Sequence, residues 1–358
     1  MRVLIVGAGI AGPTLAYWLG HLGHEPTLVE RAPEPRRGGY LVDFWGAGFD
    51  VAERMGIVAE LRRLGYRFTQ ARSVDRHGRR FASFAPEAFV NLRERYVSIA
   101  RSDLAAAILS ALDGRVETVF GDTVTAVDDD GDGVHVSFES GTRRDFDLVV
   151  GADGLHSRVR ELAFGAQQRF ERYLGIVVAV FDVAGYRPRD ELTAVMHADV
   201  GFQLLRVALR EDVTMFCISL RDDNDGGGAV LEGPRAQKEL LRRRLAGAGW
   251  ETPAVLDAMG SAQTFYFDRV SQIRMPSWTR GRVALVGDAA ACPSFLAGQG
   301  SALAMVGAYV LAAELAGRTA TTPARSPATT SASARCCGPN KTRRGASAWR
   351  SRRGRGRR

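Results

Sequence analysis

The segment VLIVGAGIAG, residues Val3–Gly12, decides the fold of the amino-terminal part of the chain. Its first four residues are apolar and three of them are β-branched, which is typical of a buried parallel strand. Gly7, Gly9 and Gly12 then complete the spacing G-x-G-x-x-G. In this spacing the glycines allow a tight turn, a close approach of backbone to a pyrophosphate, and close packing of a helix on the strand. The segment therefore predicts a dinucleotide-binding turn.

The residues after this turn agree with that prediction. A helix is expected over Pro13–Leu22, since proline is tolerated in the first helical turn, and Gly23 is expected to end it. A second strand, Pro26–Val29, leads to Glu30, close to where a dinucleotide fold places an acid on the adenosine ribose. The expected cofactor contacts in this region are the three glycines and Ile10, Ala11, Glu30 and Arg31.

Two further motifs follow at distant points of the chain: GADGLHSRVR at Gly151–Arg160 and VGDAAACPSFLAGQG at Val286–Gly300. Each places an aspartate beside a glycine, which alone is ordinary turn chemistry. No second G-x-G-x-x-G follows a strand in the sequence, so a separate nicotinamide-binding unit is not predicted. The three motifs in this order indicate FAD as the bound dinucleotide and NAD(P)H as a transient co-substrate.

This combination resembles the para-hydroxybenzoate hydroxylase-like (class A) family of FAD-dependent monooxygenases, most nearly its tetracycline- and polyketide-modifying branch. The resemblance covers about residues 1–316. It implies an α/β fold, in which a Rossmann-type FAD-binding domain of the glutathione reductase kind carries an inserted β-rich substrate domain. The expected division is a discontinuous FAD-binding domain over 1–70, 100–165 and 281–316, and a substrate domain over 71–99 and 166–280.

The resemblance also implies roles for single residues in the two later motifs. The DG motif of the family, associated with FAD pyrophosphate and NAD(P)H, corresponds to Asp153 and Gly154. The aspartate that holds the ribityl chain of the flavin corresponds to Asp288. Gly298 and Gly300, in the same motif as Asp288, complete the cofactor contacts expected there.

Arg101, in the segment ARSDLAAAIL, occupies the place of a family arginine that contacts FAD. A helix is expected over Leu104–Leu112, capped by Ser102 or Asp103. Strands are expected at Val116–Phe120, Asp122–Asp128, Gly133–Glu139, Phe146–Val150, Tyr173–Val183, Leu192–Val195, Gly201–Leu209, Thr214–Leu220, Gln263–Val270 and Val283–Val286. One helix, Arg235–Ala246, is expected to interrupt the later strands.

The activity that the resemblance implies is hydroxylation of an aromatic or polyketide-like small molecule. Flavin reduced by NAD(P)H reacts with O2 to give a C4a-hydroperoxide, whose distal oxygen passes to an electron-rich carbon. The protein excludes water and positions the substrate, so no strong nucleophile or acid–base pair is needed and no catalytic residue is assigned. Candidate substrate contacts are Gly38, Gly39, Asp43, Arg206, Tyr266 and Phe295. Arg206 could pair with a substrate phenolate or extend its stem along a sheet face.

Several positions depart from the family pattern. Relatives commonly have His where this chain has Ala291, two prolines where it has Ser294 and Phe295, and Asn where it has Ala302. Phe295 places an aromatic ring near the expected flavin ring, which could narrow the pocket. Two alternatives therefore stay open. One is an FAD-dependent oxidoreductase that inserts no oxygen, and the other is a catalytically impaired flavin-binding product with an aberrant carboxyl terminus.

The composition, with 46% hydrophobic residues among 358, is sufficient for a large core in two joined domains. The first strand starts at Val3 and the apolar run Ser301–Ala316 contains Glu314, so neither a leader peptide nor a membrane span is predicted. Four cysteines and six histidines lack ligand spacing, so no metal site or disulfide framework is expected. The run DDDGDG at Asp128–Gly133 lacks the glutamate of a calcium loop and predicts a hairpin turn. These features favour a cytoplasmic location.

The carboxyl-terminal segment differs from the rest of the chain in charge. Residues 315–358 contain eleven arginines, one lysine and no acidic residue, a charge of +12, whereas the whole chain carries +8. Residues 317–358 lack helical or strand periodicity, which is typical of disorder. The chain contains 46 arginines and two lysines, a ratio typical of GC-rich genomes, in which shifted reading frames are rich in Arg, Ala, Pro and Gly. We therefore favour a shifted reading frame after about Ala316 over an arm that binds nucleic acid. The oligomeric state stays open.

Overall fold

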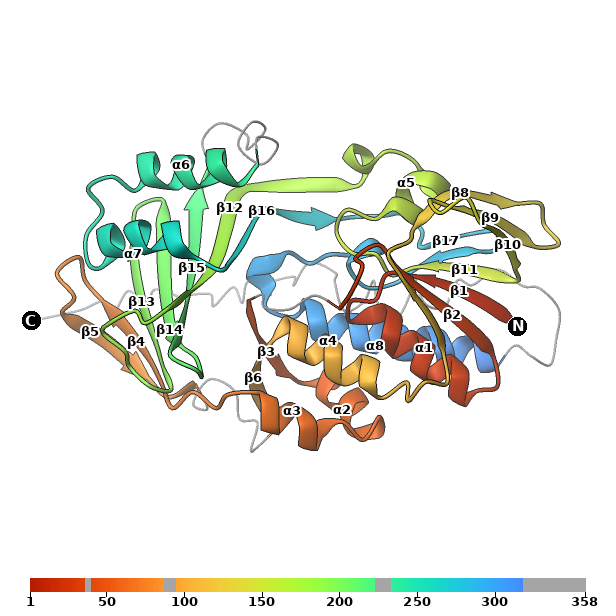
Figure 1. Cartoon of the computed structure of the whole chain (residues 1–358), viewed down its shortest axis with the longest axis horizontal. Coiled ribbons are helices and arrows are strands. Elements are labelled where there is room, and N and C mark those ends of the chain that lie inside the picture. Colours follow the sequence, from red (N-terminus) through yellow and green to blue (C-terminus); the bar gives the residue numbers. More distant parts are fainter. Residues whose placement is uncertain (36–39, 87–94, 223–232, 318–358) are drawn as a thin grey trace, which may run out of the picture.

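The computed structural model describes residues 1–35, 40–86, 95–222 and 233–317. Two halves, each built on its own large sheet, lie side by side along the longest axis of the molecule (Figure 1). Two long paired strands, β12 (Glu171–Ala184) and β16 (Thr264–Ile273), run between the halves. The candidate contacts Gly38 and Gly39 and the arginine-rich segment after residue 317 lie outside the described residues.

The first half contains a six-stranded sheet whose central strands are parallel. In spatial order the strands are β17 (Thr279–Arg280), β18 (Val283–Leu285), β11 (Leu148–Gly151), β1 (Arg2–Val6), β2 (Glu25–Glu30) and β7 (Glu117–Phe120). Val3–Val6 are buried because both faces of the sheet are covered, which explains the continuous apolar run. The two strands and the helix expected at the amino terminus are confirmed, as is the fold class.

Helices cover one face of this sheet, and a second small sheet covers the other (Figure 1). The helical layer consists of α1 (Ala11–His21), α4 (Arg101–Ser110), α8 (Gly300–Ala316), α2 (Ala47–Arg54) and α3 (Val58–Leu64). The opposite layer consists of α5 (Arg158–Phe164) and the strands β8 (Val124–Asp129), β9 (Val134–Phe138) and β10 (Arg143–Phe146). Each layer encloses its own apolar cluster against the central strands.

Two local expectations in this half are wrong. The single strand expected over Phe146–Val150 is divided, because Phe146 ends β10, which pairs with β9, while β11 joins the parallel sheet. The helix α4 begins at Arg101, so Ser102 and Asp103 lie within its first turn and cap nothing; Ala100 holds the capping position without a side-chain hydrogen bond. The hairpin expected between β8 and β9 is confirmed.

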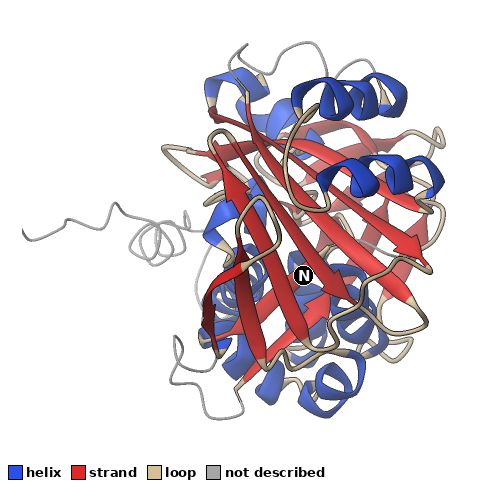
Figure 2. Ribbon diagram, turned by 90° about the vertical axis from the view of Figure 1, so that its left-hand side faces the viewer, coloured by secondary structure: helices blue, strands red, loops and turns tan. Residues whose placement is uncertain are grey.

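The second half is a seven-stranded sheet with the order β16, β12, β15 (Val213–Arg221), β14 (Phe202–Ala208), β13 (Thr193–Asp199), β4 (Gln70–Val74) and β5 (Arg80–Phe84). Figure 2 views these strands from the left of Figure 1. Side chains alternate between the two faces along each strand. One face packs on α6 (Pro234–Arg244) and α7 (Thr252–Ala258), and the other carries apolar side chains that contact the first half.

The expected strands of this sheet are present, but three features were not anticipated. The helix α7 follows α6, where one helix is expected, and β13 continues to Asp199. Residues 71–99 divide, since β4 and β5 join the large sheet whereas β6 (Tyr96–Ala100) pairs with β3 (Leu41–Trp45). Single 3-10 turns complete the fold: η2 (Gln167–Arg169), η3 (Met259–Ser261), η4 (Gly287–Ala289) and η5 (Phe295–Ala297). Within the described ranges, no helix has the length and apolar character to cross a membrane.

Candidate functional site

The three sequence motifs meet at one edge of the six-stranded sheet. We call them the glycine turn (Gly7–Gly12), the DG turn (Gly151–Arg160) and the GD loop (Val286–Gly300). Backbone hydrogen bonds join the strand ends from which they start: Gly7 N–H to Val29 O (2.7 Å), Ala152 N–H to Val6 O (2.8 Å) and Val286 N–H to Gly151 O (2.9 Å). The carboxyl ends of neighbouring parallel strands are where ligands bind in such sheets, so this edge is the candidate site.

The glycine turn is packed too tightly to accept side chains at two of its glycines. Gly7 has a φ of +107°, and a Cβ there would lie 2.6 Å from the Ala152 carbonyl oxygen. A Cβ on Gly12 would lie 1.9 Å from the Gly7 carbonyl oxygen. Ile10 is the capping residue of α1 and makes no side-chain hydrogen bond to the helix, which starts at Ala11. The first amides of α1 are therefore available to an anion.

Glu30, at the end of β2, supports the glycine turn directly. One oxygen of its carboxylate accepts a hydrogen bond from the Ala8 amide (2.8 Å), and the other accepts from the Ala32 amide (3.0 Å). The carboxylate therefore fixes the position of the turn relative to β2. Arg31, the next residue, is exposed.

In the DG turn, Asp153 is bonded to the start of α5. Its carboxylate accepts hydrogen bonds from the Ser157 hydroxyl, the Arg158 amide (2.7 Å) and the Val159 amide (3.1 Å). Burial raises the pKa of Asp153, and these hydrogen bonds act against that shift. Gly154 follows with a φ of +81°, which lets the chain reverse beside this carboxylate. The DG turn is thus built around Asp153.

Arg160, the last residue of the DG turn, links it to the GD loop. Its side chain is fully buried, and its guanidinium donates to the carbonyl oxygens of Ala289 (3.0 Å) and Leu155 (2.6 Å). Gln167 accepts a third hydrogen bond at 3.2 Å. Burial lowers the pKa of Arg160 from its ordinary value. This buried cation holds the two acidic motifs in a fixed relation.

In the GD loop, Asp288 lies near the first residue of α8. A Cβ on Gly300 would lie 3.8 Å from the Asp288 Oδ1 atom. Burial raises the pKa of the Asp288 carboxyl, and the positive charge of Arg101 acts against that shift. Unlike Asp153, Asp288 accepts no backbone amide among the residues that the structure describes. Gly298 is exposed in the left-handed region, at a φ of +62°.

Arg101, the first residue of α4, faces the glycine turn. Its amide donates to the Tyr40 carbonyl oxygen (3.0 Å), and its Nη2 atom would lie 3.5 Å from a Cβ on Gly9. In the described part of the chain no carboxylate forms an ion pair with this guanidinium. The structure therefore brings Gly9, Arg101 and Asp288 together around a guanidinium that has no ion-pair partner among the described residues.

Two predicted substrate residues lie on the sheet face that turns toward the motifs. Phe295 and Tyr266 each contact the ring of Tyr40, with centroid distances of 5.0 Å and 5.6 Å. The Tyr266 hydroxyl donates to Asp268 (3.1 Å), whose carboxylate also contacts the His156 Nε2 atom of the DG turn (3.2 Å). Burial raises the pKa of Tyr266 well above its ordinary value.

Two further predicted substrate residues, Asp43 and Arg206, lie apart from the ring contacts of Tyr40. Asp43, on β3, is exposed and accepts hydrogen bonds from the hydroxyls of Tyr96 (2.7 Å) and Ser98.

Arg206 faces the layer of α6 and α7. It is 3% exposed, forms ion pairs with Glu251 (2.7 Å) and Asp190, and lies over the ring of Trp250. Leu204, on the same strand face, belongs to the apolar cluster under these helices. Arg206 therefore neither faces the motifs nor extends into solvent, and it leaves the set of candidate substrate contacts.

Tyr40, His156 and Asp268 contact the predicted site residues or motifs but were not themselves predicted as contacts. The position of Asp268 could have been predicted, because residues two apart on a strand point to the same face and Tyr266 was already a candidate. The position of Tyr40 could not, since it depends on Arg101 and Phe295, which are distant in sequence.

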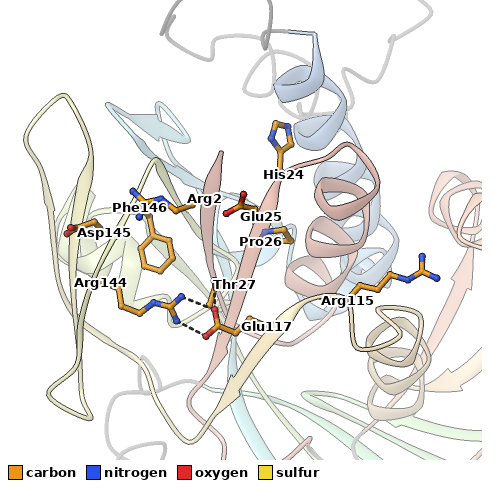
Figure 3. A pocket seen from close by; sticks show the side chains of 10 residues that line it. All are labelled: Arg2, His24, Glu25, Pro26, Thr27, Arg115, Glu117, Arg144, Asp145 and Phe146. Atoms are coloured by element: carbon orange, nitrogen blue, oxygen red, sulfur yellow. Dashed lines mark hydrogen bonds and ion pairs between the residues drawn. The ribbon is translucent and has the colours of Figure 1, made fainter.

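A groove of about 470 Å³ lies at the other end of the sheet, where Arg2 and Glu25 begin β1 and β2 (Figure 3). One ion pair lies within it: Arg144 donates to Glu117 through two hydrogen bonds of 2.8 Å, and the Thr27 hydroxyl donates to the same carboxylate (2.9 Å). Since this groove lies at the end of the sheet away from the three motifs, it is not the candidate site.

The chain is similar in sequence to FAD-binding proteins. A family model described as "FAD binding domain" matches residues 1–327. An uncharacterized protein of Mycobacterium tuberculosis is 40% identical over 322 residues, covering 87% of this chain and 84% of that protein. A flavin-dependent monooxygenase of Legionella longbeachae is 33% identical over 318 residues, covering 88% of this chain and 80% of that enzyme.

Solved structures give the same fold. The tetracycline destructase Tet(51) is 33% identical, with a TM-score of 0.78, and the match covers 89% of this chain and 82% of that one. HpxO of Klebsiella pneumoniae, in complex with FAD and uric acid, is 25% identical with a TM-score of 0.72, and the match covers 87% of this chain and 79% of that one.

Proposed function

The chain belongs to the FAD-binding domain family and is an FAD-dependent monooxygenase, and from this premise we propose that it uses NAD(P)H and O2 to hydroxylate an aromatic or polyketide-like small molecule. The observation that carries the proposal is the meeting of the three motifs at one sheet edge, opposite an apolar and aromatic sheet face. A cofactor at that edge and a substrate on that face would be neighbours.

The residues at this edge fit FAD. The amides at the start of α1 have no capping side chain, and Arg101 has no ion-pair partner in the described ranges. We propose that the glycine turn, including Ile10 and Ala11, holds the diphosphate, that Glu30 and Arg31 lie at the adenosine ribose, and that Asp288 holds the ribityl chain. Arg101, Gly298 and Gly300 would complete the contacts, with Asp153 and Gly154 shaping the DG turn.

When bound, FAD supplies the two-electron chemistry that joins NAD(P)H oxidation to O2 activation. The chain itself excludes water from this chemistry, since the sheet face toward the motifs is formed by apolar side chains such as Val178, Leu205 and Met215. The sequence contains one G-x-G-x-x-G turn, so we propose that NAD(P)H binds transiently at the same site.

We propose the six-stranded half as the FAD-binding domain and the seven-stranded half as the substrate domain, close to the division 1–70, 100–165 and 281–316 against 71–99 and 166–280. We also propose a cytoplasmic location, where NAD(P)H is available and free thiols such as those of Cys217 and Cys292 stay reduced.

The test is incubation of the purified full-length protein with NADPH or NADH and a panel of phenols, with flavin absorbance and product mass as readouts. We expect a yellow protein, substrate-stimulated flavin reduction and a product heavier by one oxygen atom. Flavin reduction without oxygen insertion would favour an oxidoreductase of the same fold, and FAD binding without reduction would favour a catalytically impaired protein. A colourless protein that gains no thermal stability from FAD would contradict the cofactor assignment.

A further inference from the structure

Three aromatic rings from separate parts of the chain contact one another in series. The Phe295 and Tyr40 rings meet edge to face, at 5.0 Å and 71°, and the Tyr40 and Tyr266 rings lie 5.6 Å apart at 47°. Phe295 comes from η5 in the GD loop, Tyr266 from β16, and Tyr40 precedes β3. We call these three residues the aromatic bridge.

The aromatic bridge lies between the cofactor motifs and the apolar sheet face. On one side, the Tyr40 carbonyl oxygen accepts from the Arg101 amide, and the charges of Arg101 and Asp288 act on the Tyr40 hydroxyl. On the other side, Tyr40 and Phe295 pack against the apolar cluster that contains Val178, Val207 and Met215. A substrate that lies on this face and reaches the cofactor must therefore share its space with these rings.

Phe295 is held in this position by its backbone. Ser294, 7% exposed, has a φ of +117° and a ψ of 159°, a conformation that essentially only glycine adopts freely. The two residues before Ser294 are hydrogen-bonded to β16. The Ile273 amide donates to the Cys292 carbonyl oxygen (3.1 Å), and the Gln272 side-chain amide donates to the Pro293 carbonyl oxygen (3.0 Å). The ring is thus directed onto the sheet face by strained and anchored chain, rather than by a free loop.

We infer that Phe295 is a specificity-determining residue, which together with Tyr40 limits the substrate to compounds with one aromatic ring. This inference rests on the proposed function. A single ring can meet the Phe295 edge in the same edge-to-face arrangement that Tyr40 uses, which is favourable for aromatic pairs. A fused system of four rings would have to displace Phe295, against the anchoring of Ser294 and the packing on the sheet face.

The experiment measures binding to the FAD-loaded full-length protein through the change in flavin absorbance, with resorcinol, 1-naphthol and tetracycline as probes of one, two and four rings. For the wild type we expect a Kd for resorcinol at least tenfold lower than that for tetracycline. Phe295→Ala should lower the Kd for tetracycline at least tenfold and change that for resorcinol less than threefold. Leu296→Ala is the matched control, since Leu296 lies on the same turn and is 51% exposed.

The inference is overturned if the wild type binds tetracycline as tightly as resorcinol, or if Phe295→Ala changes the Kd of all three probes by the same factor. FAD content and thermal midpoint are measured for each variant. If Phe295→Ala loses either, Phe295→Leu decides, because it keeps an apolar side chain and should still lower the tetracycline Kd relative to the resorcinol Kd. A wild-type protein that holds FAD but binds none of the probes would overturn the proposed substrate class, and the size limit with it.

Discussion

The DG turn and the GD loop each place an aspartate beside a glycine at the end of a parallel strand, but the protein treats the two carboxylates differently. Asp153 is bonded to two amides of α5 and to the Ser157 hydroxyl. Asp288 accepts no amide from the described chain and lies near Arg101 and the start of α8. Both residues are half-buried, and the side-chain partner of Asp288 is Cys292. The comparison teaches that an aspartate beside a glycine can bond to the following helix at one strand end and, among the described residues, leave its helix amides unbonded at the next.

The largest effect is expected from Asp153→Ala. This change leaves the amides of Arg158 and Val159 and the Ser157 hydroxyl without their acceptor at a partly buried position. Since an unsatisfied buried group costs about 1–3 kcal/mol and solvent reaches part of this turn, the free energy of unfolding of the apoprotein should fall by about 2–3 kcal/mol. Urea unfolding measures it, with Asp132→Ala in the exposed β8–β9 turn as the control. A loss no larger than the control's would show that the DG turn does not depend on this carboxylate.

Asp288→Ala should separate cofactor binding from stability. Removing the carboxyl proposed to hold the ribityl chain should lower FAD affinity about tenfold, which corresponds to about 1.4 kcal/mol. The apoprotein should be as stable as wild type or more stable, because burial disfavours the ionised carboxyl and raises its pKa. FAD titration and urea unfolding of the apoprotein measure the two quantities. A large loss of stability with unchanged FAD affinity would make Asp288 equivalent to Asp153 and remove the contrast.

Glu30→Ala tests an intermediate case, a carboxylate bonded to two amides and also proposed to contact ribose. FAD affinity should fall roughly fivefold, or about 1 kcal/mol, and FMN affinity should change much less, because FMN lacks the adenosine ribose. Parallel titrations of the apoprotein with both flavins measure the ratio. Equal losses would mean that Glu30 acts only by holding the glycine turn through Ala8.

The smallest effect is expected from His156→Gln, which removes the ionisable partner of Asp268. The hydrogen bond that the His156 ring donates to the Asp268 carboxylate raises the pKa of His156 above 6.5. The stabilisation from this pair is therefore fully present below about pH 6.5 and is lost as the pH rises through the folded-state pKa. Because the His156 side chain is 57% exposed, solvent screening keeps the effect below about 1 kcal/mol.

The free energy of unfolding of the wild type and of His156→Gln, measured with urea at pH 6 and pH 9, isolates the stabilisation from the His156–Asp268 pair. The exposed His135, whose pKa is raised to about 9 by its hydrogen bond with Asp145, titrates in the same direction in both proteins. Identical pH dependence in the two proteins would show that the contact between the DG turn and β16 contributes nothing to stability.

The sequence predicted the parts of the site that local chemistry determines. The glycine spacing is sufficient for the turn, because the close approaches of Gly7 to Ala152 and of Gly12 to Gly7 leave no room for another residue type at these two positions. The apolar run Val3–Val6 predicted a buried parallel strand, and the family resemblance implied the rest of the sheet. The internal bonding of Asp153 could not be read from the DG motif, because it depends on how α5 begins.

The positions of Arg206 and Phe146 show why other details were not predictable. Alternation along β14 indicates that neighbouring residues point to opposite faces of the sheet, but it does not indicate which face packs on the helices. Arg206 was therefore a candidate for the face toward the motifs, whereas it points toward α6 and α7. The chain at Phe146 passes from a hairpin to a parallel strand within two residues. Asp147, the residue between the two strands, also fits an alternating strand and so does not by itself mark that change. Tyr40 became visible only when the fold placed it between Phe295 and Tyr266.

The strand β16 also has a consequence for protein engineering. Its carboxyl end is bonded to the GD loop through Ile273 and Gln272, and its middle contacts the DG turn through Asp268. A chimera that exchanges the seven-stranded sheet for that of a relative would cut these contacts if its crossover points fell at the ends of the sheet. Crossovers placed after Gly298, with residues 264–298 transferred as one block, would keep the strand and the loop from the same parent. The unit to exchange in this fold is therefore larger than the seven-stranded sheet, because it includes the GD loop as far as Gly298.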